Sequence, residues 1–418
     1  MAGSRDRFDV LVAGAGPAGS VAALVLARGG ARVALVDQRS FPREKACGDL
    51  LGPRGLAVLA ELGVPAPAGP SFGDMLVVGP TGRRLRLPAA GGATYPGHAL
   101  AVPRVVLDAM LRQEALDAGA EPVTGRVGET VEVDGRLGGF RCGGRSVQAD
   151  VVIGADGACS HVAEVAGLVD LGRVRWGFAV RWYREEPVEL PVIAWWEPSP
   201  RRPLPGYGWL FPGPDGIANL GVGVATGADR RSASVAVRSV EGLTAHLERC
   251  GLLGRPSRGG GALPGRLGGW LKMGLAGTLP AAANVLLVGD AAGLVNPFQG
   301  EGIAQAMTSG AWAARAILEG PGGAADRYRG ALIARYRRFY ELGSAVQDAL
   351  LAHPAGLAAT LRVLLAPGIG PAVAGSWALL WNDLVDGAPP GRARGLARAG
   401  LLLGRGLTAG GSRTGRRG

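Results

Sequence analysis

The sequence predicts an α/β protein (α+β overall), in which a Rossmann-type domain is interrupted by an antiparallel β-sheet domain and followed by a C-terminal helical segment. A glycine-rich fingerprint lies near the amino terminus, between two short apolar runs. Alternating strand patterns separated by Gly and Pro fill residues 176–224, as is typical of antiparallel sheets. An apolar run that ends in Gly-Asp returns at Val285, and the pattern beyond it is mostly helical. The dinucleotide-binding part is therefore expected to come from segments far apart in the chain.

The fingerprint GAGPAG follows directly on an apolar run from Phe8 to Ala13, which is typical of a buried strand. Within it, Gly14 allows a tight turn, Gly16 lets the backbone approach a pyrophosphate, and Gly19 allows close packing of the helix that follows. The unpaired N–H groups at the start of this helix favour a phosphate. The stretch therefore predicts a nucleotide site.

A second apolar run, Val33 to Val36, leads to Asp37. A carboxylate at this place accepts hydrogen bonds from ribose hydroxyls and repels a 2′-phosphate, which favours FAD or NAD over NADP. A structural glycine turn is the alternative, because Gly makes up 72 of the 418 residues. Strand, glycines, helix, strand and acid in register favour dinucleotide binding.

Composition limits the other classes of function. The four Cys form no CxxC pair and the four His have no metal-ligand spacing, so we expect a reduced cytoplasmic protein without a metal. The net charge of +11 comes largely from residues 387–418, which hold seven Arg and no acidic residue and are expected to be a disordered tail. Nothing aromatic is interleaved with these Arg, so no nucleic-acid partner is expected.

The segment from Val363 to Asn382 carries no charge over 20 residues, the length of a membrane span. Because Pro367 and Pro371 interrupt it, we expect two short helices. With the Arg-rich tail they would rest on an anionic membrane surface, at the inner face of the cell membrane, or they would cover a substrate cavity. The sequence leaves both interpretations open.

Further elements are expected around the central sheet. Residues 74–87 read as a hairpin, and residues 53–62 and 103–118 read as helices. Five of the nine Trp lie between residues 176 and 209. These Trp form either a large aromatic core or a hydrophobic wall for a ligand.

Three separated motifs together resemble the para-hydroxybenzoate-hydroxylase-like flavoproteins: GAGPAGS at 14–20, GADG at 154–157 and GDAAGLVNPFQGEGI at 289–303. Two further stretches, FPREKACGDLLGPRG at 41–55 and YGWLFPGPDGIANLGVG at 207–223, are similar to the geranylgeranyl reductase family. Leu50, Gly52 and Cys159 depart from residues common in that family, which puts the identity of the substrate and the contact with a nicotinamide donor in doubt.

The resemblance implies one noncovalent FAD and a division of the chain into segments. These are FAD-binding segments at 1–72, 98–170 and 274–340, a substrate-domain hairpin at 73–97, an antiparallel substrate domain at 171–273, helices at 341–386 and the basic tail at 387–418.

The fingerprint and the resemblance together predict the site residues. Those expected to bind the cofactor are Gly14, Gly16, Pro17, Ala18, Gly19, Asp37, Lys45, Cys47, Gly48, Arg104, Val127, Asp156, Gly157, Asp290, Pro297, Gly302 and Ile303. The helix that starts at Gly302 and Ile303 would stabilise anionic reduced flavin. Cys47 is the candidate catalytic residue, as a redox group or proton donor, unless only its backbone touches FAD.

The substrate is expected to lie on the strand YGWLFP. Tyr207, Trp209 and Phe211 alternate and so face one side, and Pro212 follows them. This predicts a flat apolar wall against an isoprenoid chain.

We therefore predict an FAD-dependent reductase that saturates C=C bonds of a polyprenyl chain, such as a geranylgeranyl lipid or a prenylated quinone. Because there is only one complete fingerprint, electrons would come from NAD(P)H or from another electron carrier, including a donor protein. A flavin monooxygenase or epoxidase acting on a hydrophobic natural product is one alternative. A flavin-binding accessory protein at a membrane surface, without turnover, is another.

Overall fold

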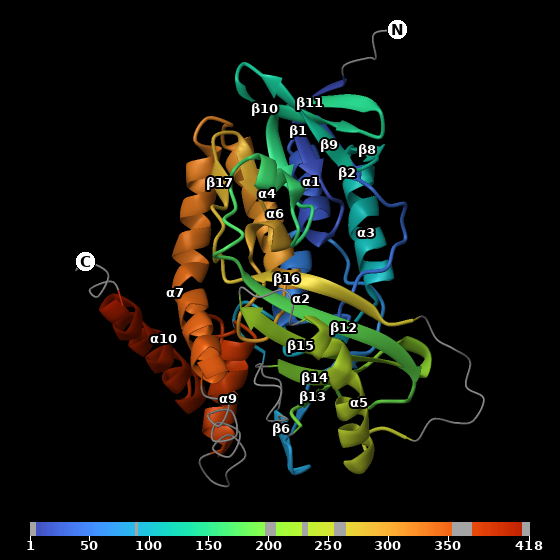
Figure 1. Cartoon of the computed structure of the whole chain (residues 1–418), viewed down its shortest axis with the longest axis vertical. Coiled ribbons are helices and arrows are strands. Elements are labelled where there is room, and N and C mark those ends of the chain that lie inside the picture. Colours follow the sequence, from blue (N-terminus) through green and yellow to red (C-terminus); the bar gives the residue numbers. More distant parts are fainter. Residues whose placement is uncertain are drawn as a thin grey trace.

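The computed structural model describes residues 6–87, 91–196, 206–227, 233–254, 265–352 and 370–411. Two large sheets lie one above the other in Figure 1, and each takes its strands from segments far apart in the sequence. Helix α7 (Ala324–Ala352) extends along one side of the molecule from the upper region to the lower one. The mixed α/β architecture predicted from the sequence is confirmed.

The upper sheet has eight strands, and its central strands are parallel. Along its main path the order is β17, β18, β11, β1, β2 and β8, and β10 and β9 continue from β11 in antiparallel pairs. Its strands are β1 (Asp6–Ala13), β2 (Val33–Asp37), β8 (Glu121–Thr124), β9 (Val127–Val133), β10 (Arg136–Cys142), β11 (Arg145–Gly154), β17 (Ala281–Ala282) and β18 (Val285–Leu287). The first strand of the fingerprint therefore lies between β2 and β11, and β18 brings the late Gly-Asp motif to the same edge.

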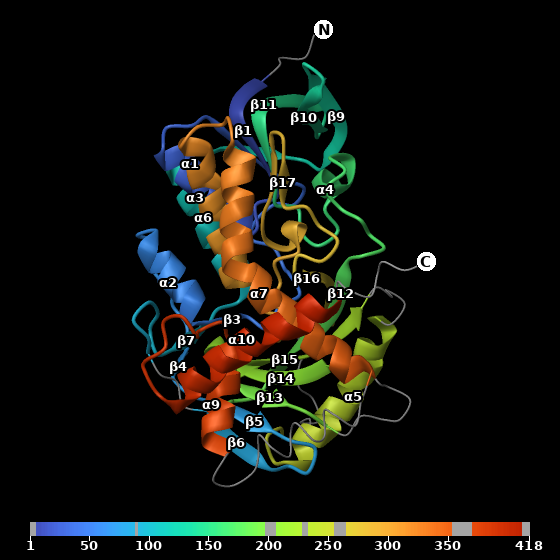
Figure 2. The same cartoon turned by 90° about the vertical axis from the view of Figure 1, so that its left-hand side faces the viewer.

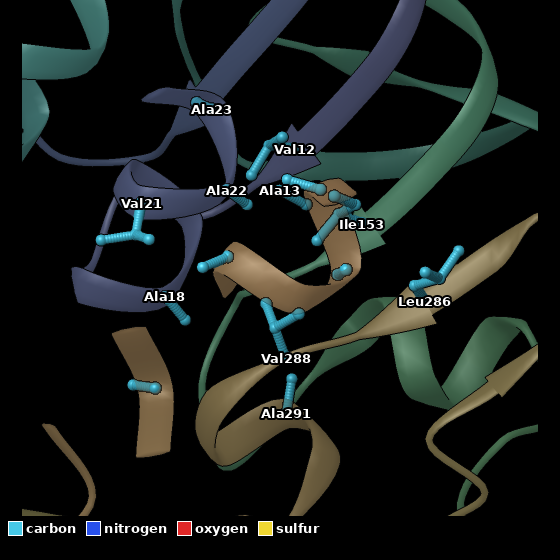
Figure 3. Close-up of a cluster of buried hydrophobic side chains, with 14 of the residues drawn as sticks. Val12, Ala13, Ala18, Val21, Ala22, Ala23, Ile153, Leu286, Val288 and Ala291 are labelled. Atoms are coloured by element: carbon cyan, nitrogen blue, oxygen red, sulfur yellow. The ribbon is translucent and has the colours of Figure 1, made fainter. Parts of the chain in front are cut away.

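The core around the fingerprint is built from small and branched side chains. Helix α1 (Pro17–Arg28) starts directly after the glycines, with Gly16 at its N-cap. Figure 3 shows Val12 of β1, Ala22 of α1, Ile153 of β11 and Leu286 of β18 in one cluster, and all four are fully buried. This packing fixes the turn between β1 and α1 against the carboxyl ends of the parallel strands.

The lower sheet has seven strands in the order β16, β12, β15, β14, β13, β5 and β6. They are β5 (Met75–Val78), β6 (Arg84–Leu87), β12 (Arg175–Glu185), β13 (Val192–Ala194), β14 (Gly206–Pro212), β15 (Ile217–Gly227) and β16 (Leu267–Met273). All neighbours are antiparallel except β13 and β5, which are parallel. This pair departs from the predicted antiparallel sheet because β5 comes from an earlier part of the chain and meets β13 without a hairpin.

The two faces of the lower sheet pack against different helices. Leu210 and Leu220 pack in a cluster with residues of α5 (Ala233–Arg249). Trp209 and Phe211 belong instead to a cluster with residues of α9 (Gly370–Trp381). Neighbouring residues of a strand point to opposite faces, so this division follows from the alternation in β14. The aromatic side chains of β14 therefore share the face covered by α9.

The remaining elements connect these layers. A small third sheet contains β3 (Leu50–Leu51), β4 (Ser71–Phe72) and β7 (Ala99–Ala101). The other helices are α2 (Pro53–Glu61), α3 (Arg104–Asp117), α4 (His161–Val165), α6 (Ile303–Leu318) and α10 (Arg392–Gly411), with short 3₁₀ helices η1 (Pro214–Gly216) and η3 (Gly289–Ala292). The predicted helices near residues 53 and 103 and the predicted hairpin at 74–87 are present.

The C-terminal region differs from the expectation. Instead of a disordered tail from residue 387, helix α10 covers Arg392–Gly411 and packs against α9 and α7 (Figure 2). Ala397 is fully buried and Leu401 packs against the main core, so apolar contacts hold this basic segment in place. Part of the uncharged segment from Val363 to Asn382 lies outside the described residues, and the rest forms α9. Among the described helices, none has the length and hydropathy to cross a membrane.

Candidate functional site

A cavity of about 1290 Å³ lies where the two sheets meet, and it extends from the glycine fingerprint to the aromatic face of β14. Among the residues that line it are Gly14, Gly16, Pro17, Ala18, Asp37, Lys45, Cys47, Gly48, Arg104, Val127, Asp156, Gly157, Tyr207, Trp209, Phe211, Asp290, Pro297, Gly302 and Ile303. Of the residues predicted from the sequence, Gly19 and Pro212 do not line it. The structure thus brings almost the whole predicted set together around one space.

The fingerprint glycines allow close backbone approach at one end of the cavity. Gly14 has a φ of 106°, and a Cβ placed on it would overlap the carbonyl oxygen of Ala155. A Cβ on Gly19 would overlap the carbonyl oxygen of Gly14, so Gly19 serves the packing of α1 on the turn. A Cβ on Gly16 would meet only a side-chain nitrogen of Arg43, at 3.4 Å. Gly16 therefore leaves open the side on which a pyrophosphate would lie.

The carboxylate of Asp37 is held in place at the end of β2. Oδ2 accepts a hydrogen bond from the backbone N–H of Ala15 at 2.8 Å, and Oδ1 accepts one from that of Arg39 at 2.9 Å. The guanidinium of Arg43 lies 3.9 Å from Asp37 and 3.2 Å from Asp108. Asp37 is thus oriented by the fingerprint itself, and each oxygen keeps a lone pair for a ribose hydroxyl.

Asp156 has a structural role in addition to lining the cavity. Its carboxylate accepts hydrogen bonds from the hydroxyl of Ser160 and from the backbone N–H of Val162 at 3.1 Å. Burial raises the pKa of this carboxyl, and these hydrogen bonds act in the opposite direction. Both oxygens therefore shape the loop before α4, and binding of cofactor by Asp156 stays a prediction.

Asp290, the acidic residue of the late Gly-Asp motif, lies beside the start of α6. A Cβ placed on Gly302, the N-cap of this helix, would be 3.3 Å from Oδ1 of Asp290. Burial raises the pKa of Asp290, whereas the positive charges of Lys45, Arg104 and Lys272 lower it. Several cations and a helix N-terminus thus meet at this part of the cavity, which suits an anionic cofactor.

The loop that carries Cys47 is fixed to the aromatic face by side chains that the sequence analysis did not select. Asn219 of β15 donates hydrogen bonds to the carbonyl oxygen of Cys47 and to Oδ2 of Asp49, both at 2.8 Å. Its Oδ1 accepts a hydrogen bond from the indole N–H of Trp209 at 2.9 Å. The hydroxyl of Tyr183 donates to Asp49 at 2.5 Å. One buried amide therefore links the loop to the aromatic face.

Sequence reasoning could have found part of this network. Asn219 is the one polar residue in the otherwise apolar run from Ile217 to Val224, and a buried polar residue in a strand needs partners. Asp49 belongs to the CGD stretch at 47–49. Its φ of 59° cannot be read from the sequence pattern. Its partners become visible only in the folded chain.

Gly48 and Gly221 allow this close packing. A Cβ on Gly48 would lie 2.9 Å from the ring of Phe211. Gly221 stands directly opposite Trp209 in the pairing of β14 with β15, and a Cβ there would overlap the indole. The two glycines therefore fix how close the loop and the neighbouring strand come to the aromatic wall.

The half-buried thiol of Cys47 lies where its protonated form is favoured. Burial raises the pKa of Cys47, and the nearby Arg104 guanidinium lowers it to a smaller extent. Arg104 is itself held by Asp108, with distances of 2.6 and 2.8 Å between the guanidinium nitrogens and the carboxylate oxygens. A protonated thiol is a poor nucleophile. Of the predicted roles for Cys47, proton donation suits this environment better than thiolate chemistry.

The aromatic wall closes the other end of the cavity. Trp195, which directly follows β13, packs against Trp377 of α9, with 5.9 Å between the ring centroids. Ile193 and Val373 belong to the same cluster and also line the cavity. The uncharged segment noted in the sequence thus contributes α9 as an apolar cover for this space.

The comparisons with known proteins agree with this geometry. The model of an FAD binding domain matches residues 7–178. A relative named menaquinone reductase, from Mycolicibacterium smegmatis, is 38% identical over 324 residues, which cover 75% of this chain and 77% of the relative. A relative named digeranylgeranylglycerophospholipid reductase 1, from Methanothermobacter thermautotrophicus, is 32% identical and covers 75% of this chain and 78% of the relative.

Solved structures show the same fold. A geranylgeranyl bacteriochlorophyll reductase-like protein from Thermoplasma acidophilum superposes with a TM-score of 0.73 and 21% identity, over 92% of this chain and 100% of the other. A flavin-dependent brominase superposes with a TM-score of 0.68 and 16% identity, over 97% of this chain and 99% of the other.

Proposed function

The chain belongs to the geranylgeranyl reductase family of FAD-dependent oxidoreductases, and we propose that it saturates C=C bonds in the polyprenyl tail of a prenylated quinone. The observation that carries this proposal is the continuous cavity of about 1290 Å³, which joins a dinucleotide fingerprint to an apolar aromatic wall. A long isoprenoid tail is apolar, and burial against such a wall removes it from water. The relative named menaquinone reductase supports a quinone, and the relative named digeranylgeranylglycerophospholipid reductase 1 supports a geranylgeranyl lipid as the second candidate.

FAD is the cofactor, and the residues present fit it. We propose that its pyrophosphate lies over Gly16 at the start of α1, that Asp37 accepts the ribose hydroxyls, and that the start of α6 faces the flavin. When reduced, FAD supplies a hydride to one carbon of the alkene. The electrons come from NAD(P)H or another electron carrier, and we propose that this carrier is bound only transiently.

The protein's own contribution is to bind, orient and desolvate the tail. Trp209 is 5% exposed and its indole N–H is fixed by Asn219, so the ring presents a rigid apolar surface. The loop at Cys47 and Gly48 lies against the same surface, so a tail held there is restricted to a narrow range of positions. Fixed orientation of the two reactants lowers the entropic part of the barrier.

We also propose that helix α10 brings the protein to an anionic membrane surface, where such tails are found. Leu396 and Leu402 are 49% and 54% exposed, although they are large apolar residues. Arg392 and Arg398 are exposed one helical turn before them, so each leucine shares a face with an arginine. Exposed apolar side chains beside cations are the combination that binds the headgroup layer.

The test is a mass measurement on the product. The FAD-loaded enzyme is reduced without oxygen and given, in separate reactions, a prenylated naphthoquinol or a geranylgeranyl lipid. We expect a gain of two hydrogens for each saturated bond, with the quinol used faster. Gly16→Val, which is expected to lack FAD, is the control for chemical reduction by the assay mixture. Absence of a saturated tail from both substrates would overturn the proposal.

The same experiment separates the reductase from the monooxygenase alternative. With oxygen and a reduced donor present, a monooxygenase or epoxidase would add one oxygen atom to the tail. A product that gains oxygen and no hydrogen pair would replace the proposed reaction with that one.

A further inference from the structure

Glu301 places a carboxyl group in the cavity between the two sheets. It follows the loop after η3 and comes directly before Gly302, the N-cap of α6. Its carboxyl lines the same space as Tyr207 and Trp209. A Cβ placed on Gly52, which also lines the cavity, would be 3.4 Å from Oε1 of Glu301. The carboxyl therefore lies between the aromatic wall and the segment that follows the Cys47 loop.

The carboxyl of Glu301 has a neutral hydrogen-bond partner. Oε2 of Glu301 accepts a hydrogen bond from the side-chain amide of Gln299 at 3.0 Å. The backbone carbonyl oxygen of Gln299 accepts another from the hydroxyl of Tyr207. Across the described ranges, no Lys, Arg or His nitrogen forms an ion pair with Glu301. A carboxylate that is largely enclosed and has no partner cation is costly, which favours the protonated form of Glu301.

The charged groups around Glu301 come from several elements. After burial, which has the largest influence on the pKa of Glu301, the charge of Asp383, after α9, raises this pKa and the charge of Arg54 of α2 lowers it. Asp383 forms an ion pair with Arg335 of α7 at 2.7 Å, which weakens the effect of Asp383 on the pKa of Glu301. Tyr207 faces it from β14 as a neutral phenol, since burial raises the pKa of Tyr207 above its ordinary value. Burial is the largest influence and raises the pKa of Glu301 to about 7.

Other acids in or beside the cavity have partners or nearby cations. Asp37 and Asp156 each accept hydrogen bonds from backbone N–H groups that fix their loops. Asp49 accepts hydrogen bonds from Tyr183, Asn219 and the backbone of Arg104. Asp290 faces the charges of three cations. Glu301 instead accepts a hydrogen bond from one neutral side chain, Gln299, so a change in its protonation disturbs neither a backbone loop nor a cluster of cations.

We propose, on the basis of the reductase function above, that Glu301 is a catalytic residue and the proton donor to the alkene. The electron pair of the hydride forms a C–H bond at one carbon of the C=C bond. The electron pair of the π bond forms the second C–H bond, with the proton of Glu301. The alkene is reduced by two electrons, the flavin is oxidised by two, and the Glu301 carboxylate regains a proton from water. Cys47, the donor predicted from the sequence, then serves to hold the loop that faces the tail.

The first measurement follows the chemistry in a single turnover. Enzyme with reduced FAD is mixed without oxygen with a prenylated quinol, so that the head group takes no electrons, and the saturated tail is measured by mass spectrometry across pH 5 to 9. The wild-type rate is expected to fall as the pH rises through about 7, because the donor must be protonated. Glu301→Gln should be slower by about 100-fold or more and lose this pH dependence. Glu301→Asp should keep the dependence at a reduced rate.

The second measurement needs no turnover. In infrared difference spectra of the oxidised, substrate-free protein, a protonated carboxyl band should titrate near pH 7 in the wild type and be absent from Glu301→Gln. Glu121→Gln, at an exposed position on β8, is the matched control and should keep the band and the rate. Flavin absorbance and thermal unfolding show whether each variant is folded and loaded.

The outcomes separate the two proposals. If the wild type yields no saturated tail, the proposed function fails, whatever Glu301 does. If the wild type is active and Glu301→Gln keeps its rate and pH profile, or if the carboxyl band is missing at every pH, Glu301 is not the donor. A pH dependence that disappears in Cys47→Ala and persists in Glu301→Gln would assign the proton to Cys47.

Discussion

The side-chain amide of Asn219 donates a hydrogen bond to the backbone carbonyl of Cys47 at 2.8 Å, although 172 positions separate the two residues in the chain. The same side chain accepts a hydrogen bond from the indole of Trp209. Asn219 is 2% exposed, so its side-chain amide is shielded from water. Gly48 and Gly221 allow the close approach of the Cys47 loop to the aromatic wall, and one amide ties the two together.

Replacing Asn219 with Leu should separate the loop from the wall. The change leaves the carbonyl of Cys47 and the indole N–H of Trp209 without partners, which costs about 1–3 kcal/mol for each group. We expect lower thermal stability and a tenfold or greater loss of turnover with FAD still bound. Asn284→Leu is the matched control, because the side-chain amide of Asn284 also donates two hydrogen bonds, here to two backbone carbonyls, but lies outside the cavity. Equal loss of turnover in both variants would make Asn219 a stability residue only.

Two glycines of the fingerprint should respond differently to substitution. Gly16→Val puts a side chain where the structure leaves space for a pyrophosphate, so the protein should fold and purify without FAD. Gly19→Val puts atoms onto the carbonyl of Gly14 and should destabilise the fold as well. Flavin absorbance and circular dichroism distinguish the two. A fully loaded Gly16→Val protein would contradict the predicted position of the pyrophosphate.

The aromatic wall should govern the use of long tails. Trp209→Ala removes a large apolar contact, so turnover of a long prenyl tail should fall about tenfold or more while flavin content is unchanged. Gly221→Ala should have a smaller effect in the same direction, because the added Cβ displaces the indole. Trp312→Ala, on α6 beside Tyr336, is the control for loss of a tryptophan away from the cavity. Loss of FAD together with stability in Trp209→Ala would mean that the ring is only core.

What could be predicted from the sequence follows from how far apart the interacting residues lie. The turn from β1 into α1 and the position of Asp37 are encoded within about thirty residues, so a local motif suffices. The faces of β14 follow from simple alternation. The network of Asn219, Asp49 and Tyr183 joins three separate segments, and no local pattern reports such a contact.

The C-terminal tail shows a different limit. Its seven Arg and its glycines favoured a disordered chain, yet Ala397 and Leu401 pack against the rest of the protein and α10 forms. Net charge alone favours disorder in this segment, whereas apolar residues at the helical period favour a helix that packs on the protein. Glu301 lies in the GEGI stretch at 300–303, but its surroundings within the described part of the chain, where it forms no ion pair, are set by neighbours from α2, β14 and the segment after α9.

The stability of the protein should depend on pH through Glu301. Burial raises the folded-state pKa of Glu301 from 4.5 to about 7, so the folded protein binds more protons than the unfolded chain between these values. Its stabilising effect is therefore complete below about pH 4.5 and is lost as the pH rises through about 7. Because one pKa unit equals about 1.4 kcal/mol, the upper bound of this loss is roughly 3 kcal/mol. Denaturant unfolding should show the wild type losing stability relative to Glu301→Gln between pH 5 and pH 8, and parallel curves would contradict the raised pKa.

Attachment to a membrane surface should depend on α10. In cosedimentation with vesicles that contain anionic lipid, the wild type should bind at low salt and be released as salt rises, because each arginine near the surface contributes about 1 kcal/mol that salt screens. Replacing Leu396 and Leu402 with Glu removes the exposed apolar groups and adds repulsion, so binding should be lost while turnover of a detergent-dispersed substrate is kept. Val106→Glu, at an exposed position on α3 that is 46% accessible, is the control and should bind like the wild type. Equal sedimentation of the wild type and the double variant would show that α10 does not bind the membrane surface. Helices α9 and α10 would then act only as the cover of the cavity.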